Sequence, residues 1–290
     1  MDENLDRLRG QDDGRPALEE PPLEHKASTR AAWIGLVVLL LIVAVGLWLW
    51  APRTSESPAE SVGRVPADPV AAPAVTPSRL GTGEPDPNLP GLGALDGYVR
   101  PLLAALSSRP ALAALLASDN LVRRFAVSVE AIARGASPAG QVRAVAPTTG
   151  FTVAQTGNGT VIDSASYARY EPLVLLVEDM DPAKLARLYG RLRPRLSDAY
   201  AELGVGGTFD EAMARALAHL IATPMPPANA RVQAAKGTNF AYVDPRFEGL
   251  SAAQRQLLRL GPDRARRVQQ RLRAFGLALG IPAEQLPMPS

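Results

Sequence analysis

Apolar residues recur every three or four positions through most of residues 95–290, and this spacing predicts a mostly helical domain. The clearest stripe is formed by Leu121, Phe125, Val129 and Ile132, at steps of four, four and three residues. Side chains at these steps share one face of an α-helix. We therefore expect this stripe to lie in the core.

Capping residues mark the helix ends. Asp119, Asp181, Thr208 and Ser251 each precede an apolar stripe and are expected N-caps, because their side chains accept hydrogen bonds from first-turn N–H groups. The predicted helices cover residues 95–106, 110–116, 120–134, 167–180, 182–203, 209–222, 252–260 and 262–279.

Two short β-hairpins are expected within this helical pattern. β-favouring residues flank Asn158-Gly159, and a second pair of short runs, 232–234 and 239–243, surrounds Lys236-Gly237. The predicted fold class is therefore mostly α, a helical domain with one or two small β-hairpins.

A strongly apolar run lies before this domain. Residues 31–50 carry no charge over twenty positions, which as a helix span about 30 Å, the thickness of the bilayer hydrocarbon. Trp33, Trp48 and Trp50 lie at its two ends, where indole rings favour the headgroup level. The leader of 30 residues is too long and too acidic for a signal peptide, so we predict a single transmembrane helix.

The flanking segments give the expected topology. Lys26 and Arg30 lie close to the first end of the apolar run, which favours a cytoplasmic N-terminus and a periplasmic C-terminal domain at a bacterial inner membrane. The nine prolines of residues 51–94 predict an extended spacer. The expected organisation is a disordered cytoplasmic tail (1–30), a transmembrane helix (31–50), a Pro/Ala-rich periplasmic linker (51–94) and a helical periplasmic domain (95–290).

Composition narrows the chemistry. The chain has no cysteine and two histidines, His25 and His219, which excludes thiol chemistry and cysteine-ligated metal. No catalytic, cofactor-binding or metal-binding residue is predicted, and no cofactor is expected. If the domain were a glycosidase-like hydrolase, the best candidates for its two catalytic acids would be Glu171 and Glu178, which lie seven residues apart.

Basic side chains are the strongest remaining signal. Between residues 255 and 273 the chain has seven arginines and one acid. Two helix faces form the candidate binding surface: Arg264, Arg267 and Arg271, and Lys184, Arg187 and Arg191. Such faces could bind an envelope protein, an acidic wall polymer or phospholipid headgroups. The simpler interpretation is that they are solvated helix surfaces. Nucleic acid is not expected beyond a membrane.

A third group pairs arginines with aromatic residues. The candidate groove or structural ion pairs involve Arg123, Arg124, Arg169, Tyr170, Asp244 and Glu248. Arginines beside core aromatics often pair with acids, and Asp244 and Glu248 are the acids considered for this role.

Several separated motifs, in order, resemble the bacterial family called domain of unknown function 3014. They are Leu121–Phe125, Ala133–Gly135, Gly150-Phe151, Tyr167–Tyr170, Leu188-Tyr189, Ala199–Gly204, Ala222–Pro224, Tyr242–Pro245, Glu248, Leu250-Ser251, Gln254 and Leu257–Pro262. The resemblance covers roughly residues 90–280 and departs at Ala252-Ala253 and Arg255. It implies a membrane-anchored envelope protein and assigns no activity.

The predicted membrane anchor, the proline-rich spacer and the absence of a recognisable set of catalytic residues together favour a binding or scaffold protein of the bacterial envelope. The bilayer is its expected partner through residues 31–50, and an envelope protein or acidic cell-wall polymer is the expected partner of its domain. The alternatives are a periplasmic hydrolase acting through paired carboxylates and a membrane signalling or regulatory protein that recruits through its acidic tail.

Overall fold

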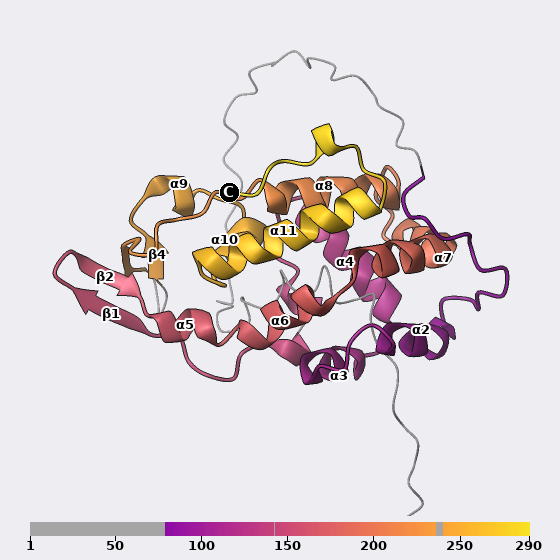
Figure 1. Cartoon of the computed structure of the whole chain (residues 1–290), viewed down its shortest axis with the longest axis horizontal. Helices are drawn as coiled ribbons and strands as arrows, with labels where there is room; N and C mark the ends of the chain where they lie inside the picture. Colours follow the sequence, from indigo (N-terminus) through magenta and orange to yellow (C-terminus); the bar gives the residue numbers. More distant parts are fainter. Residues whose placement is uncertain (1–78, 142, 236–239) are drawn as a thin grey trace, which may run out of the picture. The chain divides into compact units, whose positions relative to one another are not determined.

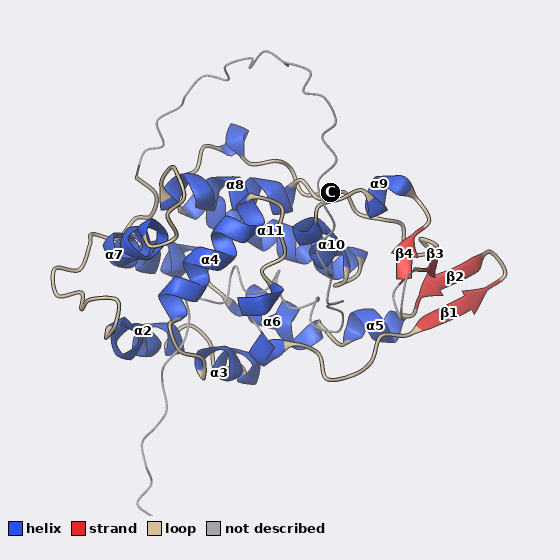
Figure 2. Ribbon diagram, turned by 180° about the vertical axis from the view of Figure 1, so that it is seen from behind, coloured by secondary structure: helices blue, strands red, loops and turns tan. Residues whose placement is uncertain are grey.

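The computed structural model describes residues 79–141, 143–235 and 240–290, and the described part is predominantly helical (Figures 1 and 2). The helices are α2 (Leu95–Ala104), α3 (Pro110–Leu116), α4 (Leu121–Ala133), α5 (Ser164–Ala168), α6 (Glu171–Asp179), α7 (Pro182–Ala201), α8 (Phe209–Ile221), α9 (Pro245–Glu248), α10 (Ala252–Leu258) and α11 (Pro262–Ala278). Short 3₁₀ turns lie at Ala139–Gln141, Arg143–Val145 and Ala283–Gln285. The predicted mostly α class is confirmed.

The predicted transmembrane helix over residues 31–50 and the tail before it lie outside the described residues. None of the helices in the described part of the chain combines the length and the apolar character that a bilayer crossing requires.

Four helices, α4, α7, α8 and α11, pack around one core. The predicted stripe on α4 is buried throughout, as are the apolar residues Ala265, Val268, Leu272 and Phe275 of α11. Phe209, at the start of α8, lies at the centre of an aromatic cluster. Its ring centroid is 5.7 Å from Phe125, 6.0 Å from Tyr189 and 5.7 Å from Tyr200, so one side chain joins α8 to α4 and α7.

Three of the four predicted N-caps are confirmed. Asp181 caps α7, and Thr208 and Ser251 form capping boxes at α8 and α10. The prediction for Asp119 is wrong, because α4 begins one residue later than expected and Asp96 of α2 supplies the acceptor. Its carboxylate accepts hydrogen bonds from the backbone N–H groups of Asn120 and Leu121, at 2.6 and 3.0 Å. A tertiary contact therefore replaces the local cap.

The two predicted hairpins are present. β1 (Val153–Thr156) pairs with β2 (Gly159–Ile162), and β3 (Val232–Ala234) pairs with β4 (Phe240–Tyr242), both antiparallel. A single bridge between Val161 and Arg231 brings the hairpins together edge to edge. Arg231 is thus paired with a residue that lies seventy positions earlier in the chain.

Residues 80–90, here called the strap, cross the outside of α7, although their composition placed them in the linker. The side chains of Leu80 and Leu89 are buried in the core. Backbone N–H groups of Gly81 and Thr82 donate to the carbonyls of Leu279 and Ala186, at 2.9 and 3.3 Å. The folded region therefore includes residues that the proline pattern assigned to the spacer.

The strap approaches α7 most closely where two glycines meet. A Cβ atom added to Gly190 would lie 2.5 Å from the backbone nitrogen of Gly83, well inside van der Waals contact. Neither position has room for a side chain, so this crossing depends on glycine at both.

Candidate functional site

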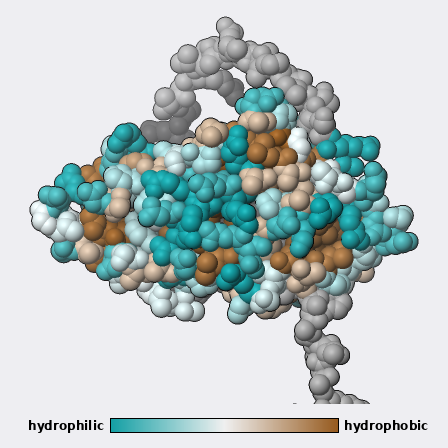
Figure 3. Space-filling model, viewed as in Figure 1, coloured by the Kyte–Doolittle hydropathy of each residue, from teal (hydrophilic) through white to brown (hydrophobic). Residues whose placement is uncertain are grey.

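The first predicted basic face is turned toward α6 and forms ion pairs within the fold. Arg264 pairs with Glu171, and the Arg267 guanidinium contacts Glu178 at 2.9 Å and Glu171 at 3.3 Å. Arg271 donates to the backbone carbonyls of Glu178 and Met180 at the end of α6. Figure 3 shows hydrophilic residues over the middle of this face, where α11 and α6 lie in Figure 1. These arginines join α11 to α6.

The same ion pairs determine the protonation of the acid pair considered for hydrolysis. Burial raises the pKa of Glu171, but hydrogen bonds from Arg264 and Arg267 outweigh burial and hold the pKa below its ordinary value. A glycosidase needs one carboxyl group that stays protonated near neutral pH. Glu171 is held as an anion, which is unsuited to that role.

Reversing the charge of Arg267 is expected to lower the free energy of unfolding by about 1–2 kcal/mol, because three carboxylates would then meet at a partly exposed site. Combining Arg267→Glu with Glu178→Arg should recover part of that loss. Urea unfolding of both single variants and the double variant measures this coupling. Additive losses would show that the pair contributes nothing.

The second predicted face, on α7, is divided between the strap and solvent. Arg191 donates to the Asp86 carboxylate at 2.8 Å and to the Tyr98 hydroxyl at 3.0 Å. Hydrogen bonds from Tyr98 and Arg191 lower the pKa of Asp86 to about 2. Lys184 and Arg187 are exposed and form no ion pair with a described residue. Arg191 therefore contacts the strap, whereas Lys184 and Arg187, which the sequence placed on the same face, are left exposed to solvent.

The third predicted group is dispersed, and its arginines have other partners than the acids considered. Arg123 binds Glu202 through two hydrogen bonds, at 2.6 and 2.9 Å, and joins α4 to the end of α7. Arg124 donates to the carbonyl of Gln141. These are contacts within the fold, and neither arginine lines a groove with its predicted neighbours.

Arg169 packs against aromatic rings, with its guanidinium carbon 5.2 Å from the centroid of Tyr170 and 5.6 Å from that of Phe151. The acids pair locally instead. Asp244 pairs with Arg246 at 2.6 Å, and Glu248 pairs with Arg255 at 2.7 Å.

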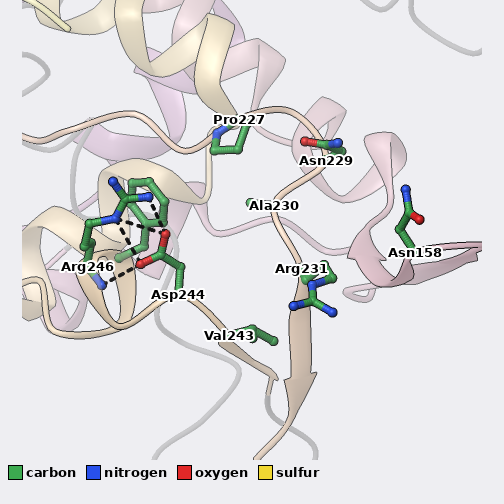
Figure 4. Close-up of a pocket in the computed structure, with 9 residues that line it drawn as sticks. Asn158, Pro227, Asn229, Ala230, Arg231, Val243, Asp244 and Arg246 are labelled. Atoms are coloured by element: carbon green, nitrogen blue, oxygen red, sulfur yellow. Dashed lines mark hydrogen bonds and ion pairs between the residues drawn. The ribbon is translucent and has the colours of Figure 1, made fainter.

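A cavity of about 400 Å³ lies where the two hairpins meet the start of α9 (Figure 4). It is lined by Asn158, Pro227, Asn229, Ala230, Arg231, Val243, Asp244, Arg246 and Phe247. Three segments supply these residues: the turn of the first hairpin, the loop that leads into β3, and the junction of β4 with α9. Concave sites of this size accommodate small ligands.

Two arginines at this cavity differ in their pairing. Arg246 is paired with Asp244 and lies over the ring of Phe247, 5.6 Å from its centroid. Arg231 is exposed, and its guanidinium forms no ion pair or hydrogen bond with any residue that the structure describes. The sequence marked the turn at Asn158, the candidate acid Asp244 and the motif that contains Val243, but it gave no sign of Arg231 or Asn229.

The contact of His219 was also missed. Its Nε2 atom lies 2.7 Å from the hydroxyl oxygen of Ser251, which in turn accepts the backbone N–H of Gln254 as an N-cap, at 3.1 Å. This arrangement links α8 to α10. The serine is thus occupied by capping, and the pair has a structural role.

Burial lowers the pKa of His219 below its ordinary value of 6.5. The unfolded chain therefore binds the proton more readily, and the contribution of His219 to stability should be lost as pH falls below about 6.5. His219→Gln, which keeps a polar contact to Ser251, should flatten the dependence of the free energy of unfolding between pH 7 and 5. Parallel urea titrations check this, and equal slopes for both proteins would contradict it.

Within the described ranges, no group of three or more His, Asp or Glu side chains is placed to hold a metal ion.

No curated protein and no solved structure matches the chain. A family model described as "Protein of unknown function (DUF3014)" matches residues 121–276, more than half of the chain and the span from α4 into α11. The chain belongs to this family.

Proposed function

We propose that this chain is a binding protein of the bacterial envelope, anchored through residues 31–50, and that its helical domain takes its ligand at the cavity between the hairpins. The apolar run, its tryptophan ends and the proline-rich spacer support the anchored topology. The domain would then face the periplasm, within reach of wall polymers and envelope proteins.

One observation carries the choice of site: Arg231, which forms no ion pair with a described residue, lies beside the cavity. Arg264, Arg267 and Arg271 of α11 are engaged with α6, whereas Arg231 is exposed at the cavity. Lys184 and Arg187 are also exposed, but they project from a helix surface and line no described cavity. A concave site that carries a charge with no described ion-pair partner is better suited to bind one ligand specifically than a convex charged face.

The experiment is site-directed photo-cross-linking of the full chain in intact cells, followed by isolation of the membrane fraction. A cross-linker at Asn229, an exposed residue of the cavity, should give a discrete adduct. The matched control is Ser197, an exposed position on α7, and it should not give that adduct. Arg231→Gln should reduce the Asn229 adduct. The same adduct from both positions, or none from Asn229, would overturn the proposed site.

A further inference from the structure

We infer that the cavity recognises a carboxylate carried by a short peptide, with Arg231 as its charged contact. This inference rests on the proposed function and names the ligand class of that same site. It follows from how Arg231 is held, from the charge balance of the cavity, and from the groups that surround the guanidinium.

Both hairpins fix the position of Arg231. Its backbone bridges Val161 of β2, and its carbonyl accepts the N–H of Val243 at 3.0 Å. Its aliphatic stem lies over Gly159, where an added Cβ would be 3.3 Å from the arginine Cδ atom. Gly159 also has a φ of 114°, a conformation that L side chains rarely adopt. Part of the stem therefore lies against Gly159, while the charged end has no ion-pair partner among the residues that the structure describes.

The charge balance favours a single negative charge. Asp244 and Arg246 neutralise each other through hydrogen bonds of 2.6, 3.1 and 3.2 Å, which leaves Arg231 as the uncompensated charge of the cavity lining. A carboxylate matches one guanidinium in charge and in its two-pronged geometry. A phosphate monoester carries about −1.5 to −2 charges at neutral pH and would leave part of its charge unmatched.

The groups around Arg231 suit a peptide. Asn158 and Asn229 lie on different segments of the rim, as Figure 4 shows, and each amide offers a donor and an acceptor like those of a peptide bond. Pro227, Ala230 and Val243 give the lining an apolar part that can receive a small side chain. Peptide sites of the strand-addition type combine hydrogen bonds to the main chain with pockets that receive side chains.

The test uses the purified full-length chain in detergent and fluorescence anisotropy with defined probes. Labelled Gly-Ala-Ala presents a terminal carboxylate, and labelled Ala-Asp-Ala-amide presents a side-chain carboxylate, so the two arms distinguish the source of the charge. Labelled Gly-Ala-Ala-amide is the uncharged probe. At least one carboxylate peptide should bind about tenfold more tightly than the amide, as expected for one charge-assisted contact.

Arg231→Gln should reduce binding of the carboxylate peptide to the level of the amide. Asn229→Asp, which leaves the arginine in place and adds a negative charge to an exposed loop, should weaken it as well. Arg187→Gln is the matched control, because it removes the same positive charge from an exposed arginine that lies on α7, away from the lining residues. Unchanged circular dichroism of each variant excludes unfolding as the cause.

Equal binding of the charged and uncharged peptides, or equal effects of Arg231→Gln and Arg187→Gln, would overturn the inference. Direct binding of galacturonate or inorganic phosphate, without binding of either carboxylate peptide, would also overturn the peptide class. If no peptide binds but the Asn229 adduct in cells still depends on Arg231, the inference fails and the proposed function stands. If that adduct is missing as well, both fail.

Discussion

Replacing Phe209 by alanine is expected to lower the free energy of unfolding by about 3–5 kcal/mol, the largest effect of any single substitution considered for this domain. The ring is almost fully buried and contacts Phe125, Tyr189 and Tyr200. Its removal would leave a cavity between α4, α7 and α8, and would also remove three aromatic contacts. Urea unfolding followed by circular dichroism measures the change.

Phe209→Leu provides the matched control, because leucine fills most of the space and removes only the ring contacts. Its expected loss is about 1 kcal/mol. If the alanine and leucine variants unfold at the same urea concentration, the aromatic cluster is not the packing centre of the domain.

Replacing Gly190 by alanine is expected to destabilise the domain by about 2–3 kcal/mol and to release the strap. A Cβ at this position would lie 2.5 Å from the nitrogen and 2.9 Å from the carbonyl carbon of Gly83, both backbone atoms. Backbone cannot rotate away as a flexible side chain can, so the strap must lift from α7. Limited proteolysis should then cut within residues 80–90 of the variant and spare the wild type.

Gly97→Ala is the matched control for this prediction. Gly97 lies in α2, and no atom within 4 Å meets a Cβ added there, so alanine should be neutral or slightly stabilising. Equal stability of the Gly190→Ala and Gly97→Ala variants would mean that the strap tolerates a wider separation from α7.

Local patterns predicted most of the helices because helix formation here depends on neighbours in sequence, although the expected helix 167–180 is divided into α5 and α6, and α9 was not predicted. The stripe from Leu121 to Ile132 spans about three turns and the N-cap at Thr208 acts within one turn, and both are confirmed. The cap of α4 was missed because its acceptor, Asp96, lies twenty-four residues from the N–H group of Asn120. No local pattern encodes a contact of that range.

The same limit applies to the charged residues. A helical wheel places Arg264, Arg267 and Arg271 opposite the apolar stripe, where they would meet solvent if α11 had no neighbour on that side. The acids of α6 occupy that side in the fold, and the ion pair between Arg267 and Glu178 spans 89 residues. Periodicity therefore identified the shared face of these arginines and could not identify what covers it.

The cavity could not be predicted from local sequence, because three separate segments form it. Asn158 was marked by a turn signal, whereas Arg231 lies in a loop and bears no motif. Its importance comes from the bridge to Val161, which brings the two hairpins together. That pairing depends on how the hairpins dock, so it becomes visible only in three dimensions.

The strap also has a mechanical consequence. It lies in series between residues 1–79 and the helical body, so tension applied from the N-terminal side reaches the strap before it reaches any core helix. The first bonds to bear load are those of Leu80, whose N–H donates to Asp210 at 3.2 Å and whose carbonyl accepts from Arg193 at 3.3 Å. Bonds that break one at a time yield at lower force than bonds that break together. Stretching from that side would therefore release the length of the strap while the aromatic centre of the domain stays folded.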